Sequence, residues 1–221
     1  MFITTNQQLG FIHIPKCGGT SIFAAFRGGH PKGPNLENEQ DPWSPWLILK
    51  THSSFKEFQK QKKKTDPAIW FTVVRHPCQR YHTWYYFQLA WDKKQLNGEL
   101  PLKGLSKKQI VDRITTFEKY GLKGTFKYLD SIQNIESVKV SRACNWLMYD
   151  WIDGCNNIEI FKLEEIEKLY SWLNGIGCTV PYSHVKQTPR TTSWQDDFDD
   201  ELTELVYQRY KRDFLEFNYK L

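Results

Sequence analysis

The chain has 221 residues, which is enough for one α/β domain with a full hydrophobic core and short for two. Its 40% hydrophobic and 15% aromatic content excludes an intrinsically disordered polypeptide. The net charge of +5 suits an anionic ligand without identifying one. No apolar stretch approaches the roughly 20 residues of a membrane span, and the first residues lack the apolar core of a signal peptide. We therefore expect a single domain over residues 1–221 in the cytoplasm.

Metal ions and nucleic acids are not indicated by the sequence. Five cysteines are scattered without a CxxC pair or another metal-ligand spacing, at positions 17, 78, 144, 155 and 178. Reduced thiols are their simplest interpretation. The densest basic run is Lys60-Gln61-Lys62-Lys63-Lys64, which is typical of a solvated helix end. The alternative interpretation is that this run forms an edge of the protein that attracts an acidic polymer. No nucleic-acid-binding motif accompanies it.

The first strand and the loop after it predict an anion site. Phe11, Ile12 and Ile14 form a short apolar run, and Pro15 ends it because proline has no N–H to give to a sheet. Gly18-Gly19 allows a tight turn, Thr20-Ser21 starts a helix with two hydroxyls, and Lys16 adds a positive charge. Exposed N–H groups at such a helix start attract phosphate or sulfate. The alternative is an ordinary strand-to-helix turn with a surface lysine.

The remaining elements alternate between strands and helices. Further strands are predicted at 46–51, 68–74 and 157–163. Helices are predicted at 20–27, from a cap at Ser53 or Ser54 to about 61, and at 78–91, 106–120, 138–151, 164–174 and 199–214. Glycines and prolines make 30–45 and 175–194 loops. This alternation predicts an α/β fold with a central parallel sheet flanked by helices.

Three chemically active side chains follow three different predicted strands. Lys16, His52 and Arg75 each come directly after an apolar run. Because ligands of parallel sheets bind at the carboxyl ends of the strands, we expect these side chains to converge on one rim.

The loop also resembles a known nucleotide-binding segment. Pro15-Lys16-Cys17-Gly18-Gly19-Thr20-Ser21 is similar to the 5′-phosphosulfate loop of sulfotransferases that use 3′-phosphoadenosine-5′-phosphosulfate (PAPS). The closest resemblance is to carbohydrate sulfotransferases of the heparan sulfate 2-O type. The Walker A loop differs, because there the lysine follows the last glycine. The resemblance implies a P-loop-like sulfotransferase fold and donor contacts from Lys16, Cys17, Gly18, Gly19, Thr20 and Ser21.

Three further segments resemble parts of the same family. Residues 75–87 are similar to its 3′-phosphate motif, which implies that Arg75 and Thr83 bind that phosphate; Thr83 replaces the usual serine, and His76 replaces an Asp or Asn. Residues 49–55 are similar to the segment that carries the general base, which implies that role for His52. Residues 182–217 are similar to the closing pattern, which implies cofactor contacts from Thr188 and Arg190.

Two other residues have plain structural interpretations. His13 lies in a strand and is predicted to be a core residue. Glu164 matches a family glutamate, but a carboxylate at a helix start is sufficiently explained by the helix dipole.

The function implied by the resemblance is sulfuryl transfer from PAPS to an acceptor hydroxyl on a carbohydrate. The donor is converted to adenosine 3′,5′-bisphosphate (PAP). His52 would remove the hydroxyl proton, and Lys16 would stabilise the developing charge, with no metal required. Two alternatives stay open. One is a small P-loop kinase, because an anion-binding loop can bind a phosphoryl donor as well as a sulfuryl donor. The other is a non-catalytic module that binds sulfated or phosphorylated glycans.

Overall fold

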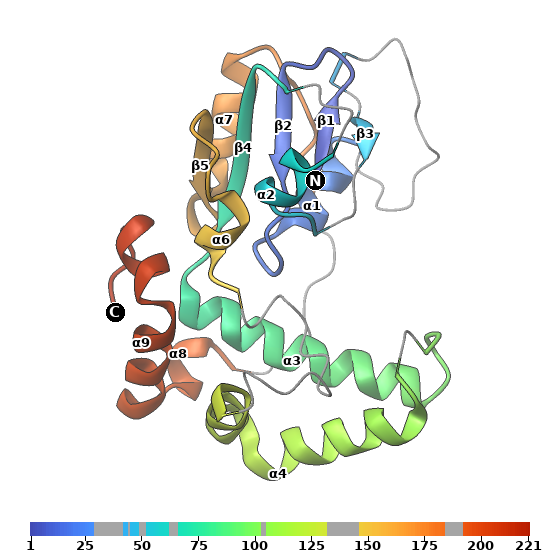
Figure 1. Ribbon diagram of the computed structural model, residues 1–221, viewed down its shortest axis with the longest axis vertical. Coiled ribbons are helices and arrows are strands. Elements are labelled where there is room, and N and C mark those ends of the chain that lie inside the picture. Colours follow the sequence, from blue (N-terminus) through green and yellow to red (C-terminus); the bar gives the residue numbers. More distant parts are fainter. Residues whose placement is uncertain are drawn as a thin grey trace. The chain divides into compact units, whose positions relative to one another are not determined.

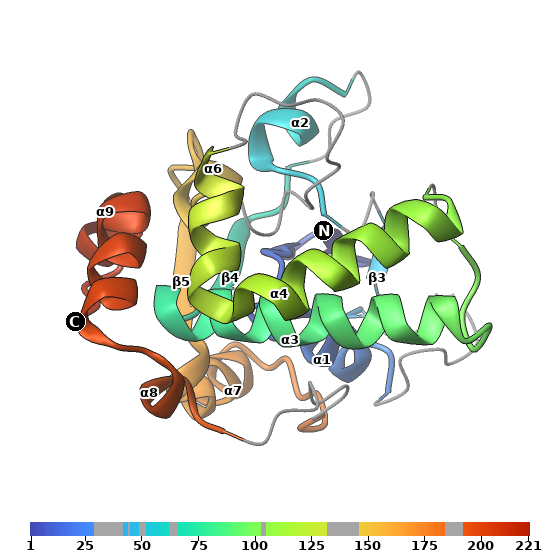
Figure 2. The same cartoon turned by 90° about the horizontal axis from the view of Figure 1, so that it is seen from below.

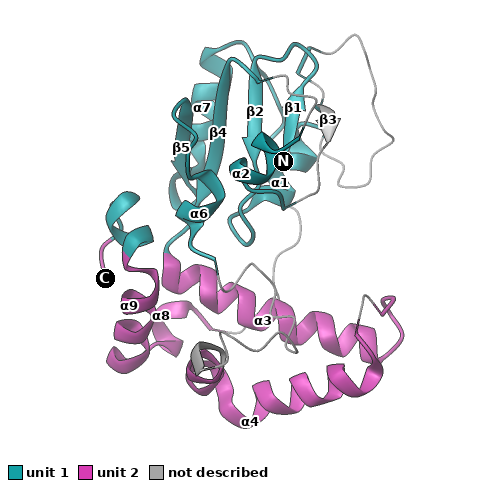
Figure 3. Ribbon diagram, viewed as in Figure 1, with its two compact units in different colours: residues 1–76, 146–187, 212–219 teal, residues 77–145, 188–211, 220–221 magenta. Residues whose placement is uncertain are grey.

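The computed structural model describes residues 1–28, 42–43, 45–48, 52–61, 66–102, 105–131, 146–183 and 192–221 (Figure 1). The chain forms two compact units (Figure 3). Unit 1 comprises Met1–His76, Trp146–Gln187 and Arg212–Tyr219, and unit 2 comprises Pro77–Asn145, Thr188–Lys211 and Lys220–Leu221. The expectation of a single domain over 1–221 stays a prediction.

Unit 1 is built on a five-stranded sheet with the order β3-β1-β2-β4-β5. The strands are β1 (Phe2–Thr4), β2 (Leu9–Ile12), β3 (Pro45–Ile48), β4 (Ile69–Val74) and β5 (Ile158–Lys162). β4 runs parallel to both β2 and β5, whereas β1 is antiparallel to β2 and β3. β2 to β5 therefore all end at the same edge of the sheet. The predicted α/β fold with a mostly parallel sheet is confirmed, and the antiparallel β1 is an addition that the sequence did not predict.

The two faces of the sheet carry separate hydrophobic clusters, because alternate residues of a strand point to opposite sides. Trp70 and Val74 of β4 face a cluster shared with α2 (Phe55–Gln59) and α6 (Met148–Ile152). Phe71 and Val73 face the opposite cluster, which includes residues of α1 (Gly19–Ala25) and α7 (Ile166–Gly175). Helices thus cover both faces of the sheet (Figure 1). A short 3₁₀ helix, η1 (Leu163–Glu165), joins β5 to α7.

A capping box fixes the start of α2. The Ser54 hydroxyl accepts the Glu57 N–H at 3.2 Å, and the Glu57 carboxylate accepts the Ser54 N–H at 2.9 Å. The predicted cap at Ser53 or Ser54 is confirmed at Ser54. Because this cap lies two residues after His52, it fixes the backbone beside that side chain.

Unit 2 contains α3 (Pro77–Leu96), α4 (Lys107–Ser131), α8 (Trp194–Asp197) and most of α9 (Asp200–Glu216). α3 and α4 pack side by side (Figure 2). Between them, the fully buried Asp92 accepts two hydrogen bonds of 2.6 Å from the Arg113 guanidinium. The predicted end at residue 120 coincides with a break in α4, because Gly121 leaves the helical conformation with φ 62° before a second helical segment continues to Ser131. None of the described helices is both long and apolar enough to cross a membrane.

The last turn of α9 belongs to unit 1, where Asp213 accepts hydrogen bonds from the start of α6. Asp213 is fully buried, and its carboxylate accepts the N–H groups of Met148 at 2.8 Å and Tyr149 at 3.0 Å. The first amides of a helix have no partner inside the helix, so this side chain supplies the acceptors that α6 needs.

We predict that Asp213→Ala lowers the free energy of unfolding by about 2–5 kcal/mol, because the buried N–H of Met148 and the partly buried N–H of Tyr149 lose their acceptor. Urea denaturation measures the change. The control is Glu216→Ala on the same helix, where an exposed carboxylate lies 3.6 Å from Arg212; we expect a change below about 0.5 kcal/mol there. Equal stability of Asp213→Ala and the wild type would contradict this account.

Candidate functional site

The loop after β2 turns sharply within a few residues. Lys16 and Gly18 adopt left-handed backbone angles, with φ of 68° and 77°. A lysine rarely takes this conformation, which costs about 1 kcal/mol or more and persists only where the surroundings impose it. The loop leads directly into α1 with Gly18 as its N-cap. The hydroxyls of Thr20 and Ser21 therefore lie within the helix and do not cap it.

His13 packs against the backbone of this loop. A Cβ atom added to Gly19 would lie 2.0 Å from Cδ2 and 2.3 Å from Nε2 of His13, so only glycine fits. The His13 side chain is buried, as predicted for a core residue, and its Nδ1 has no hydrogen-bond partner among the described residues. Burial lowers the pKa of His13 well below its usual value, and His52 and Lys16 lower it further. The ring is therefore neutral at pH 7.

Arg75 connects the turn after β4 to the loop after β2. Its Nη1 donates to the main-chain carbonyl of Lys16 at 3.2 Å, and the residue is 9% exposed. Met148 supports both segments, because its sulfur lies 3.4 Å from the Arg75 N–H and 3.6 Å from the Cys17 thiol. The Cys17 side chain is thus part of the core, and only its main chain can serve a ligand of the loop.

His52 lies beside His13, with 4.5 Å between the ring centroids, and 6.3 Å from the centroid of Trp151. The residue reaches solvent, but the packing of its ring lowers the pKa. A hydrogen bond to the His13 backbone opposes this shift, and the positive charge of Lys16 adds to it. The result is a neutral imidazole at neutral pH, which is the form that accepts a proton.

The structure brings Lys16, His52 and Arg75 together in unit 1. His52 packs against His13, which contacts Gly19 of the loop, and Arg75 bonds to the Lys16 carbonyl. Thr83 lies on α3 in unit 2. Thr188 and Arg190 lie outside the described residues. The assignment of these side chains to a nucleotide stays a prediction.

Thr83 has an unusual environment for a helical threonine. The residue is 7% exposed, and its Oγ1 has no hydrogen-bond partner among the described residues. Threonine in a helix usually satisfies its hydroxyl on a carbonyl of the preceding turn. A buried hydroxyl without a partner is costly, so this atom is suited to a ligand that reaches it.

Two residues near the loops were missed or undervalued by the sequence analysis. Trp151 is fully buried beside His52, and its Nε1 has no partner among the described residues. Nothing local in the sequence distinguishes it from any core tryptophan. Glu164 lies in the first turn of η1, in line with its interpretation as a helix-start carboxylate, and it also accepts the main-chain N–H of His76 at 2.8 Å. That contact joins residues 88 positions apart, which helical spacing cannot reveal.

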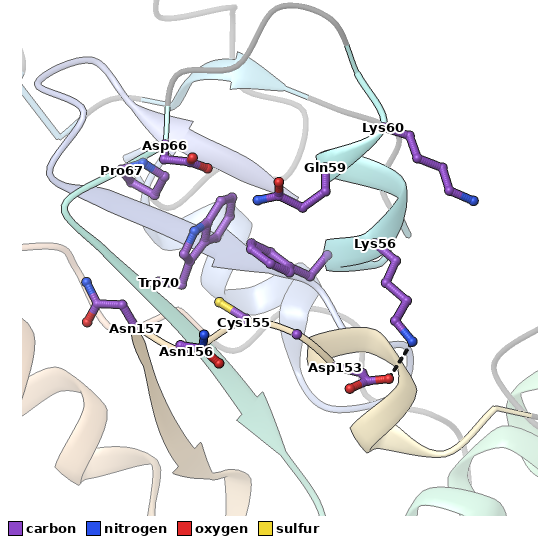
Figure 4. Close-up of a pocket in the computed structure, with 12 residues that line it drawn as sticks. Lys56, Gln59, Lys60, Asp66, Pro67, Trp70, Asp153, Cys155, Asn156 and Asn157 are labelled. Atoms are coloured by element: carbon purple, nitrogen blue, oxygen red, sulfur yellow. Dashed lines mark hydrogen bonds and ion pairs between the residues drawn. The ribbon is translucent and has the colours of Figure 1, made fainter.

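A pocket of about 680 Å³ lies elsewhere in unit 1, between α2 and the segment that precedes β5 (Figure 4). Its lining includes Trp70 and Asn157, and the ion pair of Lys56 with Asp153 at 2.5 Å borders it. None of the predicted site residues lines this pocket. Within the described ranges, no group of three His, Cys, Asp or Glu side chains could hold a metal ion.

Comparison with known proteins identifies one matching family. The model of the sulfotransferase family matches residues 1–220. No protein with a curated description matches the chain, and no solved structure matches it.

We predict that Gly19→Ala destabilises the protein by about 1–3 kcal/mol, because the new Cβ overlaps the buried His13 ring. Chemical denaturation measures the loss, which should shrink when the same change is made in a His13→Ala background. The matched control is Gly175→Ala, where no atom lies within 4 Å of the new Cβ; it should change stability by less than about 1 kcal/mol. A Gly19→Ala variant as stable as the wild type would show that the ring does not occupy this space.

Proposed function

The chain belongs to the sulfotransferase family, and on this basis we propose that it transfers a sulfuryl group from PAPS to a hydroxyl of a carbohydrate and leaves PAP. The observation that carries the proposal is the grouping of Lys16, His52 and Arg75 in one part of unit 1. The carbohydrate acceptor rests on the resemblance of residues 15–21 to the heparan sulfate 2-O type.

Lys16 and Arg75 are suited to a doubly phosphorylated nucleotide. When bound, PAPS supplies the sulfuryl group and a good leaving group. The Lys16 ammonium would balance the negative charge that develops on the oxygen between sulfur and the 5′-phosphate. The Arg75 guanidinium can bind a phosphate in bidentate fashion. We assign the 5′-phosphosulfate to the segment that contains Lys16, Cys17, Gly18, Gly19, Thr20 and Ser21, with Cys17 acting through its main chain.

From the resemblance of residues 75–87 to the 3′-phosphate motif of the family, Arg75 and Thr83 are assigned to that phosphate, and Thr188 and Arg190 to further contacts with the nucleotide. The buried Thr83 hydroxyl supports this assignment, because it has no partner among the described residues. A phosphate oxygen would satisfy it with a charge-assisted hydrogen bond.

His52 is proposed as the general base. Its neutral imidazole would take the proton of the acceptor hydroxyl while a bond forms between that oxygen and sulfur. The bond between sulfur and the bridging oxygen breaks, and its electron pair stays on the 5′-phosphate of PAP. Packing against His13 and Trp151 would hold the ring in place, which contributes positioning as well as proton transfer.

We predict that Lys16→Ala and His52→Ala each lower kcat/KM for sulfate transfer from labelled PAPS by about 10²–10⁴-fold. Lys168→Ala serves as the control, because among the described residues that exposed lysine forms its ion pair with Glu165, three residues away. The wild-type rate should fall as pH drops through a value below about 6.5, because protonation removes the base and the pKa of His52 is lowered. Near wild-type activity in both variants would contradict the assignment.

A second prediction separates sulfotransfer from the kinase and the binding module. PAP should raise the melting temperature without magnesium, because no metal takes part in holding the nucleotide. Stabilisation only by ATP with magnesium would support the kinase. Binding of a sulfated polymer with strong salt dependence, and no effect of any nucleotide, would support the non-catalytic module.

A further inference from the structure

η1 lies against the loop that contains Lys16. A Cβ atom added to Gly18 would be 2.7 Å from Cδ1 of Leu163, so the first residue of η1 packs directly on that loop. Gly18 also needs its left-handed angle, with φ 77°. The position of η1 therefore limits the path of the loop.

Glu164, the next residue, binds the turn that follows β4. One carboxylate oxygen accepts the main-chain N–H of His76 at 2.8 Å, and the other accepts the hydroxyl of Tyr219 at 2.9 Å. These partners are 88 and 55 residues away in the sequence. His76 directly follows Arg75, so the carboxylate fixes the peptide unit that joins Arg75 to the rest of the turn.

Tyr219 is held in the form that donates to Glu164. Burial raises the pKa of the Tyr219 hydroxyl, and the neighbouring Glu164 carboxylate raises it further. The centroids of the Tyr219 and His76 rings are 5.3 Å apart. The Lys162 ammonium nitrogen lies 4.4 Å from the centroid of the Tyr219 ring. Lys162 also donates to the Asn218 carbonyl at 2.9 Å. Lys162, the last residue of β5, therefore holds the segment around residue 219 beside the start of η1.

We propose that Glu164 is a positioning residue for the nucleotide donor, which it serves by holding the turn of Arg75 while the adjacent Leu163 supports Gly18. This inference rests on the proposed function, because it assumes that both segments bind the nucleotide. Glu164 itself would not touch the donor. Both of its oxygens already accept hydrogen bonds, and its negative charge would repel a phosphate.

The test is the affinity for PAP, measured by isothermal titration calorimetry, together with the KM for PAPS and for the acceptor. Glu164→Ala should weaken PAP binding at least about tenfold, because the His76 N–H in the Arg75 turn loses its acceptor. The KM for PAPS should rise while the KM for the acceptor stays unchanged. A general loss of folded protein would lower the active fraction without this split.

Three further variants sharpen the test. Glu164→Gln should stay within about threefold of the wild type, because the amide oxygen can still accept the His76 N–H and the amide N–H₂ can donate to Tyr219. Tyr219→Phe removes one hydrogen bond and should weaken PAP binding by about threefold to tenfold; it also serves if Glu164→Ala does not fold. Glu165→Ala is the matched control, because the ion pair that this neighbouring carboxylate makes within the described residues is with the exposed Lys168.

Each outcome decides the matter. Wild-type affinity for PAP in both Glu164→Ala and Tyr219→Phe would overturn the positioning role and leave the proposed function intact. Equal loss in Glu164→Ala and Glu164→Gln would overturn it as well, since the hydrogen bond to His76 would then not be the cause. A wild-type protein that does not bind PAP would overturn the proposed function, and the positioning role with it.

Discussion

One hydrogen bond joins the two segments on which the site depends. The Arg75 guanidinium donates to the Lys16 carbonyl at 3.2 Å, across the ends of two parallel strands that are neighbours in the sheet. A nearly buried guanidinium needs acceptors, since leaving it unpaired costs several kcal/mol. The carbonyl that accepts this bond belongs to a lysine in a left-handed conformation. The strained loop and the buried cation therefore stabilise each other, and neither segment can move far without the other.

The same small region sets the protonation of its histidines. Burial is the main reason for the low pKa of both His13 and His52, and the positive charge of Lys16 lowers each pKa further. The charge that suits the loop to an anion therefore also favours the neutral imidazole that a general base requires. The His13 ring packs directly on the backbone of Gly19, because glycine has no side chain to separate the ring from the loop.

Local sequence signals predicted part of this structure. The apolar runs that end at Pro15 and Arg75 predicted β2 and β4, and the serines after His52 predicted the cap of α2, because each signal lies within a few residues. β1 was not predicted, since three residues carry no measurable periodicity. The contacts of Glu164, Asp213 and Trp151 escaped prediction for another reason. They depend on partners between 55 and 99 positions away, and only the folded chain brings these together.

The most direct test of the account is an experimental structure of the protein with PAP. We expect the 5′-phosphate within hydrogen-bond distance of the Lys16 ammonium and the main chain of Gly18 and Gly19, and the 3′-phosphate on the Arg75 guanidinium. PAP bound elsewhere, for example in the pocket beside α2 and Trp70, would contradict it.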